Sequence, residues 1–258
     1  MKGRFINLDR CPDRRTSIEA ELERCGLPYK RFPAIDGSDG QRACFQSHLS
    51  VLQQDRDEPI HVLEDDAILS GYTKAVVEYV VSSGVLDKFD LVHTETFVGP
   101  DIKELRELRQ SFDKHVQAGT FEVRDITATY QACMTSYLVG SGRERLMAAL
   151  ERHAEMCELP IDLFIRQEAR AGRLKVGCVF PFATSCRYDQ PTSMAGRPSD
   201  NASHSKRAFD LLRYSFFVDR DFARTADIVA ALRAKRDPHQ EIIEAVLGFM
   251  TSDEFMMF

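Results

Sequence analysis

Short apolar runs alternate with stretches of helical periodicity along the first two hundred residues. The apolar runs predict strands over 4–8, 29–34, 59–63, 89–94, 121–126, 132–139 and 174–180. Apolar positions at three- and four-residue spacing predict helices over 12–25, 43–54, 143–157 and from 160 onward, and a helical or mixed segment over 72–81. This alternation is typical of an α/β fold with a mostly parallel sheet flanked by helices.

Three segments depart from this alternation. Residues 98–119 are charged and poorly patterned, which predicts a helix plus a loop that projects from the body. Residues 183–205 are rich in Ser, Pro, Gly and Asn and predict a long loop, and the pattern is helical from 206 to the end. We therefore expect one α/β domain over 1–200 and a helical C-terminal extension over 201–258, packed on or beside it.

Composition and charge exclude several classes of protein. The chain has 258 residues, of which 43% are apolar and 29% charged, as in ordinary globular proteins. Its formal net charge of -6 provides no global positive field for a nucleic-acid backbone. We expect no nucleic-acid partner, and a phosphate-binding site would have to be local.

Cysteine usage and the termini bear on location. The seven cysteines are an odd number without a C-x-x-C pair, which favours a reducing compartment. We find no signal segment and no run of the length of a membrane span, so a cytoplasmic location is expected. The apolar residues 255–258 could dock on the body or touch the inner face of a membrane. The oligomeric state is not indicated.

An acidic triplet follows the buried strand over 59–63. Glu64, Asp65 and Asp66 would lie at the carboxyl end of a parallel strand, where α/β folds bind ligands. In extended backbone Glu64 and Asp66 share one face and offer hard oxygen ligands for Mg²⁺ or Mn²⁺ shared with a diphosphate. A solvated acidic turn is the alternative, since about one such triplet arises by chance at this composition.

Four motifs in order resemble glycosyltransferase family 25. They are FINLDR at 5–10, followed by Asp13 and Arg14, then RFPAIDG at 31–37, ACFQSH at 43–48 and VLEDDA at 62–67. Thinner similarity continues through the later strands and helices, so that it covers roughly residues 4–195. The family includes bacterial lipooligosaccharide galactosyltransferases and the domains that glycosylate collagen hydroxylysine.

The resemblance implies a GT-A-like fold and an inverting transfer from a nucleotide sugar. The implied donor is a UDP-hexose, with galactose favoured, and the implied cofactor is Mn²⁺ or Mg²⁺ at the acidic motif. The implied acceptor is a saccharide such as a lipooligosaccharide or another surface glycan, which could be lipid-linked.

The resemblance also assigns site residues by position. Asp66 would ligate the metal together with Glu64, and Glu64 and Asp65 would face the ribose or the donor sugar. Arg14 would be a phosphate clamp or an ion pair on a helix surface. The other implied donor-binding residues are Asn7, Leu8, Arg10, Asp36, Gly37, Ser47 and His48.

For several of these residues the pattern leaves alternatives open. Asp36 and Gly37 could form a turn in which Gly37 supplies an unusual backbone angle. His48 could be a core or capping histidine. The catalytic base is assigned to Asp162, which matches the family's Pro-x-Asp but could be only a helix N-cap. Asp189 or His204 could add a metal ligand.

Two other functions use the same residues. A metal-dependent phosphohydrolase acting on a nucleotide sugar or phosphoester could use Glu64 and Asp66, with water in place of the acceptor. A non-catalytic module could keep the nucleotide-sugar pocket without the base. Donor turnover in the absence of an acceptor distinguishes the hydrolase from the transferase.

Overall fold

The computed structural model describes residues 1–54, 56–187, 204–221, 241, 244–245 and 248, with side chains from 209 onward in the last helix. The division into a domain over 1–200 and an extension over 201–258 stays a prediction. Asp189, one of the two additional metal ligands expected from the sequence, lies outside the described residues, and so does the side chain of His204.

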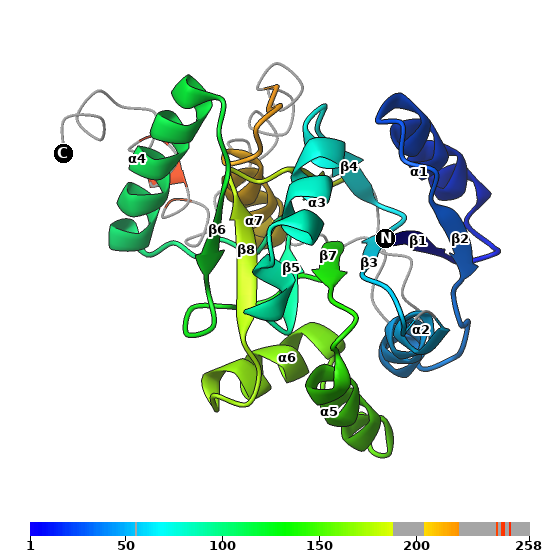
Figure 1. The fold of residues 1–258 in the computed structure, drawn as a ribbon. Helices are drawn as coiled ribbons and strands as arrows, with labels where there is room; N and C mark the ends of the chain where they lie inside the picture. Colours follow the sequence, from blue (N-terminus) through cyan, green and yellow to red (C-terminus); the bar gives the residue numbers. More distant parts are fainter. Residues whose placement is uncertain (55, 188–203, 222–240, 242–243, 246–247, 249–258) are drawn as a thin grey trace.

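A mostly parallel sheet runs through the described chain (Figure 1). The described residues form seven strands in it, in the order β2-β1-β3-β7-β5-β8-β6. Strands β1, β2, β3, β5 and β8 run in one direction, and β6 and β7 run in the other. The strands are β1 Lys2–Asn7, β2 Lys30–Pro33, β3 Ile60–Glu64, β5 Leu91–His93, β6 Glu122–Asp125, β7 Ser136–Val139 and β8 Val176–Phe180. The predicted α/β, GT-A-like fold is confirmed.

Helices flank the sheet, with α1 and α2 near its β2 edge and α4 beside β6 (Figure 1). They are α1 Pro12–Arg24, α2 Gly40–Gln54, α3 Thr73–Ser82, α4 Ile102–Ala118, α5 Glu144–Ala154, α6 Ile161–Arg170 and α7 His204–Tyr214, with a 3-10 turn at Val85–Asp87. Helix α1 begins with a proline in its first turn and buries Ile18 and Leu22, one turn apart. The same periodicity that predicted the helices therefore sets the faces they bury.

The largest part of the core lies between the sheet and helices α2, α5 and α6. Phe45 of α2, Leu150 of α5 and Ile165 of α6 are at most 1% exposed there. This packing holds α2 and the start of α6 close to the carboxyl ends of β1 and β3.

A second apolar cluster fixes the last described helix to the body. Leu212 and Phe216 pack with Phe112 of α4 and Phe180 of β8. The backbone N–H of Phe182 donates to the carbonyl of Phe216 at 2.9 Å. Helix α7 is therefore part of the described core rather than a separate appendage.

The structure corrects four of the predicted boundaries. Helix α2 begins at Gly40 instead of 43, because Asp39 accepts a hydrogen bond from the Arg42 N–H at 3.0 Å and starts the helix early. The strand predicted over 132–139 begins only at 136, since Cys133 has a φ of 120°, outside the strand region. Residues 102–118 form one regular helix, which Asp101 caps by accepting from the Glu104 N–H.

The fourth correction is a small second sheet. Strands β4 Ala67–Leu69 and β9 Thr184–Cys186 pair antiparallel, so the predicted loop over 183–205 is wrong at its start. Each strand is only three residues long, too short to give a periodic signal. The pair matters because it begins directly after the acidic triplet. Within the described residues, no helix is long and apolar enough to cross a membrane.

Candidate functional site

A cavity of about 640 Å³ opens at the carboxyl ends of β1 and β3. Its lining includes every site residue predicted from the sequence whose side chain is described, and these come from five separate segments. They are Asn7, Leu8, Arg10, Arg14, Asp36, Gly37, Ser47, His48, Glu64, Asp65, Asp66 and Asp162. The structure therefore brings the predicted site together, and their roles stay predictions.

The neighbouring strand β1 helps to orient the acidic triplet. The parallel register pairs Ile6 with Glu64, which puts Asn7 beside Asp65. The Asn7 amide donates to Asp65 Oδ2 at 2.7 Å and to the Cys11 carbonyl at 3.1 Å, while its oxygen accepts from Arg31 Nε at 3.0 Å. Asn7 is 1% exposed, so its amide orients Asp65 and serves the protein itself.

Arg14 of α1 lies against the triplet. One of its terminal nitrogens is 2.6 Å from Asp65 Oδ1 and 3.0 Å from Asp66 Oδ2. Burial alone would lower the pKa of Arg14, but Asp66 and Asp65 together raise it. Arg14 is thus a half-buried partner of two carboxylates, so the ion pair expected as an alternative is present, but it lies at the cavity and not on an exposed helix surface.

Asp66 is the least compensated of the three carboxylates. Its Oδ1 is buried and has no hydrogen-bond partner. Burial and the charge of Glu64 raise the pKa of Asp66 to about 7, against the opposing effect of Arg14. A buried oxygen in a cluster with excess negative charge fits a divalent cation, whose preferred ligands are hard oxygens.

Glu64 is linked to a buried histidine on α2. His48 Nε2 lies 3.2 Å from Glu64 Oε1, and His48 Nδ1 lies 2.9 Å from the Tyr137 hydroxyl. Burial would raise the pKa of Glu64, but His48 and the two arginines Arg14 and Arg213 hold it below its usual value. His48 is 1% exposed but lines the cavity, so it is a core histidine and a wall residue at once.

Ser47 and Gly37 have more local roles. The Ser47 hydroxyl accepts from the Ile35 N–H at 2.9 Å and donates to the Ala43 carbonyl at 2.8 Å, joining α2 to the preceding loop. Gly37 is not among the residues with positive φ, so the turn with an unusual backbone angle is wrong. Its neighbour Asp36 accepts from Arg10 Nε at 2.8 Å at the exposed rim.

Asp162 also lines the cavity, in the first turn of α6. Pro160 is the N-cap and Asp162 is the second helical residue, so the N-cap alternative is wrong. Its Oδ1 accepts from the Leu163 N–H at 2.8 Å. The helix N-terminus favours the ionised carboxylate at this position.

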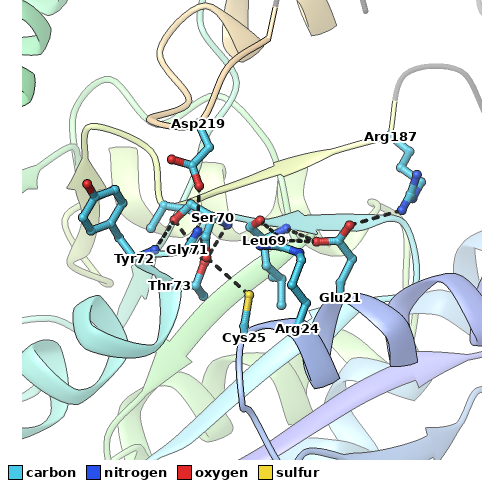
Figure 2. Close-up of polar contacts among 11 residues, drawn as sticks. Glu21, Arg24, Cys25, Leu69, Ser70, Gly71, Tyr72, Thr73, Arg187 and Asp219 are labelled. Carbon is cyan, nitrogen blue, oxygen red and sulfur yellow. Dashed lines mark hydrogen bonds and ion pairs between the residues drawn. The ribbon is translucent and has the colours of Figure 1, made fainter.

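Arg187 was missed because it falls in the segment predicted to be loop. It follows β9, and its backbone N–H donates to the Asp66 carbonyl at 2.8 Å. Figure 2 shows its side chain reaching toward Glu21 of α1, which also accepts from the Leu69 N–H. The Arg187 Nε is buried without a hydrogen-bond partner, and the side chain lines the cavity. Only tertiary pairing of β4 with β9 brings it there.

Helix α7 supplies a further wall that the sequence did not predict. Arg213 lies 3.0 Å from Asp210 Oδ1 and 3.4 Å from Oε2 of the fully buried Glu95, and it also contacts the sulfur of Cys186. Arg213 and Asp210 both line the cavity, as does Phe209. The helical periodicity after 206 predicted a helix without indicating which residues it presents to the site.

Comparison with known proteins agrees with the motifs. The family model of glycosyltransferase family 25, described as an LPS biosynthesis protein, matches residues 38–165, about half of the chain. The matched range contains the acidic triplet, the Cys44–His48 segment and Asp162. No curated protein matches the chain. The geometry of the cavity and this match lead to one conclusion: the chain belongs to glycosyltransferase family 25.

Proposed function

We propose that the protein is a metal-dependent, inverting hexosyltransferase that uses a UDP-sugar, with UDP-galactose favoured. The acceptor in this proposal is a saccharide of a lipooligosaccharide or another surface glycan, carried on a lipid at the inner, cytoplasmic face of a membrane. The observation that carries the proposal is the unpartnered Asp66 Oδ1 within the carboxylate triplet, which lines the cavity.

The described residues fit a divalent cation at the triplet. Asp66 and Glu64 would hold Mn²⁺ or Mg²⁺, because carboxylate oxygens are the ligands these ions prefer. The ion supplies charge stabilisation for the departing nucleoside diphosphate. Asn7 and Arg14 keep Asp65 and Asp66 in place, so that the carboxylates do not have to reorganise when the donor arrives.

Arg187 is suited to the diphosphate of the donor. Its side chain lines the cavity, its backbone is bonded to Asp66, and its buried Nε lacks a partner. An N–H that is buried and unpaired gains a full charge-assisted hydrogen bond when a phosphate oxygen reaches it. Arg10 and Asp36 lie at the exposed rim, where they would meet the nucleoside.

Asp162 is the base in this mechanism. As the acceptor oxygen forms its bond to the anomeric carbon, the bond between that carbon and the diphosphate oxygen breaks. The acceptor hydroxyl proton passes to the Asp162 carboxylate, which the α6 N-terminus keeps ionised. A single displacement of this kind inverts the anomeric configuration.

An aromatic pair is suited to the acceptor. The rings of Phe97 and Phe209 have centroids 5.0 Å apart, and both residues line the cavity. The chain has no tryptophan, and Tyr130 and Tyr137 are at most 1% exposed, so these two tyrosines are not available for stacking. Phe97 and Phe209 can offer an apolar face to a sugar ring.

Turnover measurements test the proposal. UDP-galactose, UDP-glucose and UDP-N-acetylglucosamine are each incubated with the protein and Mn²⁺, with and without lipooligosaccharide, and both UDP release and glycan mass are followed. We expect UDP release to be slow alone and to rise with the acceptor, with one hexose added. Rapid release of UDP or UMP without any acceptor would instead support the phosphohydrolase.

A further inference from the structure

Three side chains of unlike chemistry converge on one wall of the cavity. Cys44 and His48 lie one turn apart on α2, and Glu64 faces them from the end of β3. Their ligand atoms all lie within 4.8 Å of one another. Among the described residues, this is the one trio of Cys, His, Asp and Glu side chains that meets so closely.

The distances within this trio suit a small tetrahedral ion. His48 Nε2 is 3.2 Å from Glu64 Oε1. Two ligand atoms bound at roughly 2.0–2.1 Å to a tetrahedral ion are about 3.4 Å apart. The distance between His48 Nε2 and Glu64 Oε1 would therefore change little on binding. The i, i+4 spacing puts the Cys44 sulfur on the same face of α2 as the imidazole.

Tyr137 gives His48 the support that metal-bound histidines usually have. Its hydroxyl lies 2.9 Å from Nδ1, on the side of the ring away from Glu64. When Nδ1 carries the proton and donates it to this hydroxyl, the lone pair of Nε2 is directed toward Glu64. Tyr137 is fully buried in β7, so the ring has a fixed partner.

We propose that Cys44, His48 and Glu64 form a binding site for a thiophilic divalent ion of the Zn²⁺ class. Thiolate, imidazole and carboxylate are the three ligand types that zinc takes in proteins, whereas Mg²⁺ and Mn²⁺ favour oxygen ligands. All three residues line the cavity, so the fourth coordination position is open to it. The site differs in ligand set from the carboxylate triplet and shares only Glu64 with it. Binding displaces the Cys44 thiol proton to solvent.

Cobalt is the probe that separates this site from the carboxylates. The chelator-treated protein is titrated with Co²⁺, and the thiolate-to-cobalt charge-transfer absorption is recorded, since a site of oxygen ligands does not produce it. We expect one equivalent of this absorption, its displacement by Zn²⁺ and its loss in Cys44→Ser. Cys25→Ser is the matched control, because Cys25 contacts the Ser70 carbonyl outside the cavity lining (Figure 2). The control should keep the full signal.

Two further measurements guard against a variant that fails to fold. Tyr137→Phe keeps the buried ring and should weaken Co²⁺ binding by roughly 10–100-fold. X-ray absorption of the zinc-loaded wild type should show one sulfur neighbour. A shell of oxygen and nitrogen only, or charge-transfer absorption that persists in Cys44→Ser, would overturn the proposal. UDP binding with Mn²⁺, measured on the chelator-treated protein before cobalt is added, tests the proposed function by itself.

Discussion

Arg187 lines the cavity, a terminal nitrogen of its guanidinium lies 3.5 Å from Glu21, and its buried Nε has no hydrogen-bond partner. If it binds the donor diphosphate, Arg187→Gln should weaken UDP binding about tenfold or more, since a hydrogen bond to a charged group contributes roughly 1.5–3 kcal/mol. Uridine, which has no phosphate, should bind equally to both proteins. Isothermal titration calorimetry with UDP and uridine makes the comparison.

The matched control for this experiment is Arg24→Gln. Arg24 bonds the same Glu21 carboxylate but does not line the cavity (Figure 2). It should leave both affinities unchanged. Equal UDP affinity in wild type and Arg187→Gln would remove Arg187 from the donor site.

Replacing Asp162 should slow the chemical step and leave donor binding unchanged. Asp162→Asn keeps the size and the hydrogen bond to the Leu163 N–H but cannot accept the acceptor proton. Loss of a general base costs roughly 10²–10⁴-fold in kcat. Steady-state transfer kinetics together with UDP-sugar titration test this, and unchanged kcat would show that another group is the base.

Some residues of the site could be named from the sequence, but the contacts that hold them could not. Motifs over 5–67 were enough to name Asn7, His48 and the triplet, because all of them fall within the motifs. Asn7 and the triplet lie at the ends of β1 and β3, and His48 lies on α2 between these strands. The sequence could not show that the Asn7 amide holds Asp65, nor that Arg14 bridges two carboxylates, because both contacts cross about fifty residues. Arg187 and Arg213 had no local signal at all.

Strand β1 packs closely against the segment after α1. A Cβ added at Gly3 would lie 1.9 Å from Cδ1 of Tyr29, whose hydroxyl is held by His61 Nδ1 at 2.7 Å. The ring cannot move without losing that bond, so Gly3→Ala should destabilise the fold by about 1–3 kcal/mol. Urea unfolding measures the change.

Gly177 of β8 provides the comparison. Its added Cβ would lie 3.1 Å from the Phe89 ring, a contact that small shifts relieve. Gly177→Ala should therefore cost clearly less than Gly3→Ala. If the two variants were equally stable, the close approach of β1 to Tyr29 would not constrain the fold.

The secondary-structure elements were predictable where they are long enough for the apolar spacing to repeat. Long helices such as α1 and α5, and buried strands such as β3, follow from the sequence because their apolar spacing repeats over several residues. Strands β4 and β9 have three residues each and exist through their pairing with each other. The early start of α2 depends on one capping aspartate, Asp39.

The folded molecule buries two histidines in the neutral form. Burial lowers the pKa of His61 and of His93 to about 3, below the ordinary value of 6.5. The unfolded chain therefore takes up protons first as the pH falls. Stability should be fully present above pH 6.5 and should decrease as the pH falls toward 3.

Unfolding by urea at pH 7 and pH 5 tests this dependence. Each histidine should contribute a loss of up to about 2 kcal/mol between pH 6.5 and 5. His93→Phe should remove about half of the histidine-dependent decrease. A decrease of the same size in His93→Phe and in the wild type would show that this imidazole is not held neutral by the fold.

The cavity draws on nearly the whole described chain. The residues that line it extend from Asn7 in β1 to Arg213 in α7. Helix α7 lies beyond residues 38–165, the part that the family model matches. The fold class and the cavity residues at the ends of β1 and β3 were predictable, because they depend on motifs and strand order. The α7 wall was not, because it depends on packing of Leu212 and Phe216 against α4 and β8.

The most direct test is a calorimetric titration of UDP with and without Mn²⁺ on wild type and Asp66→Asn. We expect Mn²⁺ to strengthen UDP binding at least about tenfold in the wild type and to have no effect in Asp66→Asn. Asp113→Asn, a change on α4 where Asp113 pairs with Arg109, should behave as the wild type. UDP binding that ignores Mn²⁺, or full metal dependence in Asp66→Asn, would contradict the metal-dependent transferase site.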